Sequence, residues 1–183
     1  MASLHDRFLA AGVRIVAIDV DTPAQHAAMI AKLDLPFPYL SDPDRSGAIE
    51  PYGLSNPDDA RNLAYPAIVV VDRDGTERWR WVSRDFADRL PEAEVLEAVE
   101  GLGLRSVTAA PLEVGPAAPG PKAMPLAALE PYFRGAKFAA MAMYLRLRDT
   151  EAAEQAKAES KAYGAEMDRY LESVKELRRR KEA

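Results

Sequence analysis

A run of apolar, mostly β-branched residues from Val13 to Val20 constrains the fold more than any other feature. Branching at Cβ favours an extended strand, and apolar side chains on both faces are typical of a parallel strand covered by helices on both sides. Gly12, just before the run, can adopt the left-handed conformation that ends a helix. We therefore expect a helix over Leu4–Ala11, followed by a buried strand, as in an α/β protein.

Helix and strand signals continue after this run in the order that an α/β domain requires. Thr22 is a good N-cap and Pro23 suits the first helical position, so a helix should extend to about Leu33. The elements expected further along are turns over 36–44, a short helix over 46–52, a strand over Ala67–Val71, a tight turn over Asp72–Gly75, an antiparallel strand over Glu77–Val82 and a helix from Pro91 to about Gly101.

The C-terminal part has a different composition. Prolines recur over Val107–Pro125 and block both helix and sheet, which indicates an extended linker or an arm lying on a surface. Beyond them, Ala136–Arg148 is apolar nearly all round and must be covered, whereas Glu151–Lys181 is amphipathic. We expect these segments to form a helical hairpin, with the first helix broken near Pro131 and Gly135.

A heptad-type seam runs along the second of these helices. It consists of Tyr163, Met167, Tyr170, Val174 and Leu177. The whole pattern divides the chain into a domain over residues 1–105, a linker over 106–125 and a helical extension over 126–183.

The composition argues against several kinds of site. The sequence has no cysteine, which removes disulfides and thiolate nucleophiles, and its 2 histidines, His5 and His26, lack a metal-binding spacing. The formal charge of −5 argues against nucleic acid as a partner. No secretory signal or membrane span is apparent, so we expect a cytoplasmic protein without membrane contact. We find no phosphate loop, HExxH motif or Ser-His-Asp set, and expect no cofactor and no metal.

Several local motifs, in the same order along the chain, resemble the AhpC/TSA peroxiredoxin-like family. They are Gly12–Val20 followed by His26, Leu33–Asp44, Tyr52–Leu54, Tyr65–Gly75 and the basic residue Arg80 on the next strand. The resemblance covers about residues 3–104. It implies a thioredoxin-like three-layer α/β sandwich, incomplete at its N-terminus, with the helical extension added. It also implies a thiol oxidoreductase, although a chain without cysteine cannot carry out thiol chemistry as it stands.

The resemblance implies candidate site residues. In this fold the proline before the third core strand is usually cis, and the residue before it can pair with an extended substrate. Pro66 and Tyr65 match these positions, which implies a docking platform or, alternatively, a fold element with nothing bound. Asp19 and Asp21, at the carboxyl end of a strand, are possible site-edge residues for a divalent cation, or caps of the following helix. Arg80 matches a basic position whose role needs a thiolate. No residue is assigned a catalytic role.

The resemblance further implies that one strand and its cysteine loop are absent. That strand lies between those that match Val13–Val20 and Ala67–Val71, so both keep an open edge of backbone groups. Upstream residues of a longer protein can complete the gap, including the case of a selenocysteine codon read as a stop. A second copy of the chain or the C-terminal region can also complete it. We therefore expect a homo-oligomer formed by strand or helix exchange.

One motif favours completion by the C-terminal region. Tyr132–Phe138 resembles the family's aromatic-Arg-Gly segment before its two cysteines, and Phe138 and Met141 fall at the cysteine positions. The chain would then be a circular permutant with an inactive site. The alternative is a helix, which is favoured because Glu130 and Pro131 are unsuited to a central strand.

Three functions fit the sequence. The chain can be a piece of a peroxiredoxin-like oxidoreductase whose redox centre lies upstream or was lost. It can instead be a non-catalytic thioredoxin-like module for binding or oligomerisation, assembled through its helical tail. The third possibility is a small-molecule site around Asp19, Tyr65 and Pro66. His26 is expected to be a surface or half-buried helix residue.

Overall fold

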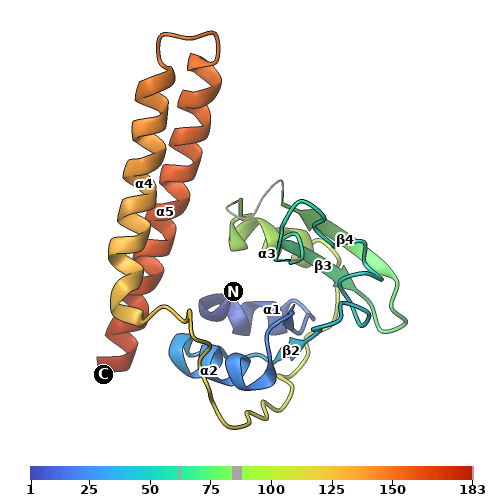
Figure 1. Cartoon of the computed structure of the whole chain (residues 1–183). Coiled ribbons are helices and arrows are strands. Elements are labelled where there is room, and N and C mark those ends of the chain that lie inside the picture. Colours follow the sequence, from blue (N-terminus) through green and yellow to red (C-terminus); the bar gives the residue numbers. More distant parts are fainter. Residues whose placement is uncertain (62, 84–87, 183) are drawn as a thin grey trace. The chain divides into compact units, whose positions relative to one another are not determined.

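The computed structural model describes residues 1–61, 63–83 and 88–182. The chain divides into two compact units, Met1–Gly120 and Pro121–Ala183. Figure 1 shows the elements of both units, and each unit is described by itself. In chain order the N-terminal unit contains a 3-10 helix at Ala2–Leu4, α1 (His5–Ala10), β1 (Ala17–Asp19), α2 (Pro23–Leu33), β2 (Tyr39–Ser41), β3 (Ala67–Val71), β4 (Glu77–Val82) and α3 (Glu92–Glu100). The unit is therefore of mixed α/β type, as predicted.

The predicted helix boundaries of the N-terminal unit are confirmed at two sites. Gly12 follows α1 with φ of +87°, in the left-handed region. Thr22 caps α2, since its side chain accepts the Gln25 N–H while the Gln25 side chain accepts the Thr22 N–H, and Pro23 is the first helical residue. The short helix expected over 46–52 is wrong, because this stretch consists of turns.

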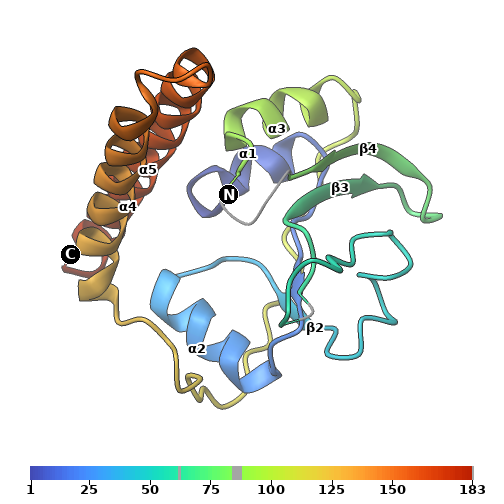
Figure 2. The ribbon, with the colours of Figure 1, turned by 45° about the horizontal axis from the view of Figure 1, so that its top comes forward.

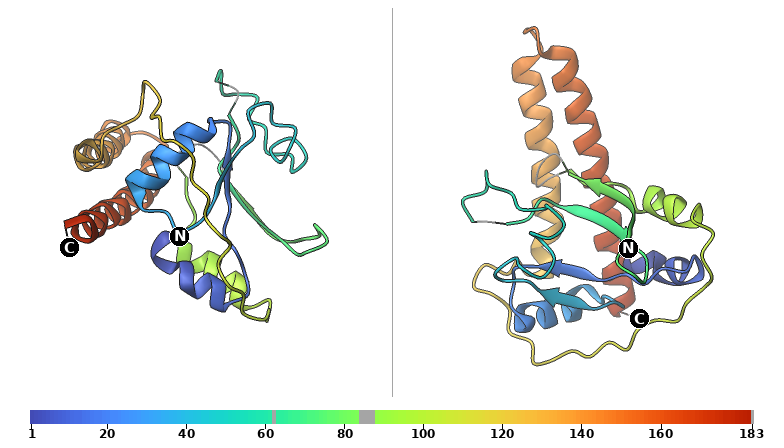
Figure 3. Two further views of the ribbon diagram at one scale, coloured as in Figure 1. Left: turned by 90° about the horizontal axis from the view of Figure 1, so that it is seen from below. Right: turned by 90° about the vertical axis from the view of Figure 1, so that its right-hand side faces the viewer.

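The strands form two separate pairs instead of one sheet. β1 pairs with β2 in parallel, with Ala17, Ile18 and Asp19 opposite Tyr39, Leu40 and Ser41, and β3 pairs with β4 antiparallel. Among the described residues no strand joins β1 to β3. Figure 3 (right) shows the two pairs within the N-terminal unit. The predicted strand over Val13–Val20 is shortened to β1, whose described partner β2 spans only Tyr39–Ser41.

One face of the β1–β2 pair is open to solvent. Ile18 and Leu40 lie opposite each other in the register and are 42% and 50% exposed. Val16, one step before β1, is also exposed. The expectation that helices cover this strand on both faces is therefore wrong for these side chains. Helix α2 packs on the opposite face, where His26 contacts Asp19, Tyr39 and Ser41.

The hydrophobic core of the N-terminal unit lies between α1, α3 and the β3–β4 pair. Its fully buried residues are Phe8, Val70, Val95, Leu96 and Val99. Trp79 on β4 packs against this cluster. Helices α1 and α3 lie side by side, as Figure 2 shows.

The proline-rich segment is an arm on the surface of the N-terminal unit. Residues 103–120 contain no helix or strand. The Val107 N–H donates to the Leu9 carbonyl of α1 (2.9 Å), and the Ala118 N–H donates to the Ala24 carbonyl of α2 (2.9 Å). Of the two forms predicted for this segment, an extended linker or a surface arm, the structure shows the arm.

The C-terminal unit is a hairpin of two long helices. α4 spans Leu126–Leu147 and α5 spans Ala153–Glu182, and they run side by side (Figure 1). The predicted break in α4 is wrong, since the helix continues through Pro131 and Gly135. The loss of one backbone hydrogen bond at Pro131 is compatible with the helix because both helices pack along their length. The circular permutation is also wrong, because Tyr132–Phe138 and Met141 lie within α4.

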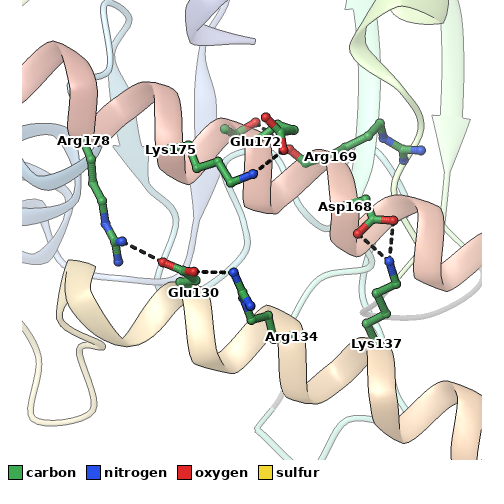
Figure 4. A network of polar contacts seen from close by, with 9 residues as sticks. Glu130, Arg134, Lys137, Asp168, Arg169, Glu172, Lys175 and Arg178 are labelled. Carbon is green, nitrogen blue, oxygen red and sulfur yellow. Dashed lines mark hydrogen bonds and ion pairs between the residues drawn. The ribbon is translucent and has the colours of Figure 1, made fainter.

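Apolar packing and ion pairs together fix the register of the hairpin. The predicted seam is confirmed, with Met167, Val174 and Leu177 buried, and Tyr170 stacks on Phe133 of α4 at a ring distance of 4.9 Å. Glu130 on α4 accepts hydrogen bonds from Arg134 (2.8 Å) and from Arg178 on α5 (2.7 Å), as Figure 4 shows. The Arg178 and Arg134 side chains lower the pKa of Glu130 and so favour its charged form.

The outer surface of α4 stays apolar. Its exposed side chains are Tyr132, Phe138, Met141, Met143 and Leu145, of which Phe138 is 62% exposed. The sequence predicted that the apolar surface of this helix is covered, but only the side that faces α5 is covered. No described helix combines the length and hydropathy that crossing a bilayer requires.

The core cluster predicts a specific loss of stability. Leu96 is 1% exposed, and Leu96→Ala leaves a cavity between α1 and α3. We expect the free energy of unfolding to fall by about 2–5 kcal/mol. Urea unfolding followed by tryptophan fluorescence measures this, since both tryptophans, Trp79 and Trp81, lie in the N-terminal unit. Leu112→Ala, at a 37% exposed position of the arm, is the control and should change stability by about 0.5 kcal/mol or less. Equal effects of the two substitutions would contradict this core assignment.

Candidate functional site

The carboxyl ends of β1 and β2 bring polar side chains together. Asp19 and Ser41 are register partners at the last positions of the two parallel strands. Helix α2 connects these strands and places His26 over the same end. Ligand sites of open α/β sheets commonly lie at this edge, so the cluster is the first candidate site of the N-terminal unit.

Asp19 holds the cluster together by accepting three hydrogen bonds. His26 Nε2 lies 2.6 Å from Asp19 Oδ1, and the Asp21 N–H donates to the same oxygen at 2.7 Å. The Tyr39 hydroxyl also donates to the Asp19 side chain. A carboxylate that accepts three donors fixes the orientation of each of them.

His26 is buried between α2 and the strands. It is only 3% exposed, and its ring stacks on Tyr39 at a centroid distance of 4.3 Å and an angle of 17°. Its Nδ1 lies 3.3 Å from Ser41 Oγ. The expectation of a surface or half-buried residue is therefore wrong, because both ring nitrogens have partners on the neighbouring strands.

The tyrosine of the cluster is held in its neutral form. Burial and, to a smaller extent, the negative charge of Asp19 and the hydrogen bond to it raise the pKa of Tyr39 far above its usual range. Tyr39 therefore acts as a hydrogen-bond donor to Asp19 at all ordinary pH values.

The residue after Ser41 fixes the turn that follows. The Asp42 carboxylate accepts hydrogen bonds from the N–H groups of Gly47, Ala48 and Ile49, each at 2.9 Å, and the Asp42 N–H donates to the Asp19 carbonyl at 2.7 Å. These backbone donors, that of Ile49 first, lower the pKa of Asp42. Three donors drawn to one carboxylate also explain why the stretch forms turns instead of the expected helix.

Asp21 does not cap the following helix. The cap of α2 is Thr22, and Asp21 instead closes a local turn through its N–H to Asp19. Within the described ranges 1–61, 63–83 and 88–182, no group of three or more His, Asp or Glu side chains is arranged to hold a metal ion.

Tyr65 and Pro66 lie at the start of β3, apart from the Asp19 cluster in the hydrogen-bond pattern. The Tyr65–Pro66 peptide is trans, so the cis bond implied by the resemblance is not present. The Tyr65 N–H donates to the Leu54 carbonyl at 2.8 Å, and the Pro66 carbonyl accepts the Ser83 N–H at 2.8 Å. These backbone groups are therefore occupied by neighbouring segments of the same unit.

The Arg80 guanidinium is bound by groups of the same unit. Its guanidinium pairs with Glu77 (2.6 Å) and donates to the Tyr52 carbonyl (2.8 Å). The hydrogen bonds with Arg80 lower the pKa of Glu77. Arg80 and Tyr65 thus both contact the 52–54 segment, whereas Asp19 and Asp21 belong to the other pair of strands.

Sequence reasoning missed two members of the Asp19 cluster, Tyr39 and Ser41, and misjudged the burial of a third, His26. Tyr39 and Ser41 were assigned to turns, although their alternation around Leu40 is the period of a strand. The statement that no Ser-His-Asp set occurs is also wrong, because Asp19, His26 and Ser41 meet through hydrogen bonds once β1 and β2 pair.

The fold and the site define a mixed α/β unit with a polar cluster at the carboxyl ends of two parallel strands. In comparison with known proteins, residues 1–80 are similar to the AhpC/TSA family. The match confirms the resemblance seen in the sequence, to a redoxin or peroxiredoxin-like family, for the segment that contains Asp19, His26, Pro66 and Arg80. No curated protein matches the chain.

The turn anchored by Asp42 predicts a pH-dependent loss of stability. Because the folded pKa of Asp42 is lowered, its contribution is complete above the usual value of 3.8 and is lost as the pH falls below it. Asp42→Asn should lower the thermal midpoint at pH 7 by several degrees and reduce the further loss on acidification. Calorimetry at a series of pH values measures both effects. Asp58→Asn, at an exposed position, is the control and should follow the unaltered chain. A parallel response of the two variants would contradict the role of Asp42.

Proposed function

We propose that residues 1–105 are the cysteine-free portion of a cytoplasmic, redoxin-like thiol oxidoreductase of thioredoxin-like, three-layer architecture. Its reactive thiol would come from residues outside the 183 of this sequence. The observation that carries the proposal is the match of residues 1–80 to the AhpC/TSA family, combined with the lack of any cysteine. The predicted division into residues 1–105, 106–125 and 126–183 belongs to this proposal.

The unpaired strand edges support the proposal. β1 and β3 each have a single described neighbour, although an apolar parallel strand such as β1 is typical of a sheet interior. A further strand between them would pair both open edges. We propose that this strand accompanies the missing thiol, and that Tyr65, Pro66 and Arg80 border the completed site.

A second function, a binding and homo-oligomerisation module, is favoured by a separate observation. Apolar side chains as large as Phe138 and Met143 are more than half exposed on α4. Exposed apolar surface of this kind commonly marks an interaction site. A second copy of the chain, joined by helix or strand exchange, is the partner proposed for it.

The redox proposal predicts that the chain alone is inactive. With hydrogen peroxide and dithiothreitol, we expect no consumption of peroxide above the rate without protein, since no thiolate is present. Peroxide loss is followed colorimetrically with protein that has been freed of metals, and a cysteine-containing peroxiredoxin serves as the positive control. Turnover that follows the protein concentration would contradict the assignment of the thiol to residues outside this chain.

The assembly proposal predicts an oligomer that depends on α4. Light scattering coupled to gel filtration should give a mass above the 20.1 kDa of one chain. Phe138→Glu should shift the equilibrium towards the monomer, because it introduces a charge into the apolar surface of α4. Lys157→Glu, at an exposed position of α5, is the control and should leave the mass unchanged. A monomer at all concentrations before any substitution would contradict the proposal.

A further inference from the structure

We propose that Ser41 is an activated nucleophile that accepts an acyl group from an activated carboxylic ester, with His26 as its base and Asp19 as the residue that orients the base. The proposal rests on the hydrogen-bonded chain from Asp19 through His26 to Ser41. It does not depend on the redoxin function proposed above.

The hydrogen bond to Asp19 sets the tautomer of His26. Asp19 Oδ1 lies 2.6 Å from Nε2, and a carboxylate accepts a hydrogen bond, so Nε2 carries the proton. The lone pair of Nδ1 is then free to accept the Ser41 hydroxyl, whose oxygen lies 3.3 Å away. This is the arrangement in which a histidine can remove a proton from a serine.

The Asp19 carboxylate is itself held in position by other donors. Besides His26, its side chain accepts the Asp21 N–H at 2.7 Å and the hydroxyl of Tyr39. These donors hold the carboxylate towards the imidazole, and the stacked Tyr39 ring limits rotation of His26. A carboxylate held in this way stabilises the imidazolium that forms when the serine loses its proton.

Ser41 is more accessible than its histidine partner. The residue is half-buried, at the carboxyl end of β2, whereas His26 is almost fully buried. Part of Ser41 is therefore open to a reagent, whereas the imidazole is enclosed. The matched control is Ser46, whose hydroxyl donates to Asp44 at 2.9 Å and belongs to an exposed residue.

The reaction is balanced without any further oxidant or reductant. Ser41 Oγ attacks the ester carbonyl carbon and transfers its proton to His26 Nδ1. The C–O bond to the leaving alkoxide or phenoxide breaks, and His26 returns the proton to that oxygen. The product is an ester of Ser41, which water can later hydrolyse.

The expected rate is modest. A positioned base contributes about 10²–10⁴-fold to such a step, whereas each missing oxyanion donor costs about 10²–10³-fold. The Asp42 N–H beside Ser41 is already bonded to the Asp19 carbonyl at 2.7 Å, so it is not open to a developing oxyanion. We therefore expect slow, stoichiometric acylation of Ser41 instead of rapid turnover.

Labelling with a fluorophosphonate probe tests the proposal on the full chain. Trypsin cuts after Lys32 and Arg45, so Ser41 and Ser46 fall on the peptides 33–45 and 46–61. We expect Ser41 to be labelled about tenfold faster than Ser46, with the modified residue located by fragmentation mass spectrometry. His26→Gln should reduce the labelling of Ser41 to the level of Ser46, while Ser46→Ala should leave it unchanged.

The comparison of the two serines decides the outcome even if His26→Gln fails to fold. Labelling of Ser41 no faster than that of Ser46 in the unaltered chain would overturn the proposal and leave the cluster with a structural role. Circular dichroism checks the fold of each variant. If folded His26→Gln is labelled at Ser41 as fast as the unaltered chain, the role of His26 as the base is likewise overturned.

Discussion

In the described part of the N-terminal unit, no strand pairs with β1 on the side away from β2, or with β3 on the side away from β4. The arrangement of the rest of the unit depends on these two unpaired strand edges. Each strand keeps one described neighbour, so the apolar run around β1 cannot be enclosed on every side. Ile18 and Leu40 remain exposed because they lie on the face of the β1–β2 pair that α2 does not cover. The stable core lies elsewhere, between α1, α3 and the β3–β4 hairpin.

The polar cluster stabilises the part of the unit that the core does not reach. Asp19 connects β1 to α2 through His26 and to β2 through Tyr39. The ring nitrogens of the buried His26 are costly to leave unpaired, so their hydrogen bonds hold the β1–α2–β2 segment in one arrangement. The same bonds give Ser41 a histidine partner, which links the local stability of this segment to its proposed chemistry.

Local signals in the sequence predicted the elements that depend on neighbouring residues. The Thr22 cap, the turn glycines and the seam of α5 depend on short-range geometry, and all are found. Features that depend on distant partners were not predictable in this way. The length of β1 is set by its pairing with β2, and the continuity of α4 through Pro131 is set by its packing on α5.

In the candidate site, too, the residue with a local signal was predictable and the residues that depend on distant partners were not. Asp19 was selected from its place at the end of a strand, a local feature. His26 and Ser41 join Asp19 only when the two parallel strands and their connecting helix pack together. The sequence alone does not bring them together, because the three residues are spread over positions 19–41. The cis bond expected at Pro66 came from the resemblance alone, and the trans bond shows that the resemblance does not fix this detail.

Among the described residues, none pairs with the edge of β1 that faces away from β2. Neighbouring N–H groups of a strand point to opposite edges, and the Ala17 N–H already donates to the Pro38 carbonyl at 3.0 Å. The Ile18 N–H therefore points to the open edge. Hydrogen exchange measured by NMR at these two amides tests the claim most directly. Fast exchange at Ile18 with protection at Ala17 is the predicted result, and equal protection of both amides would contradict it.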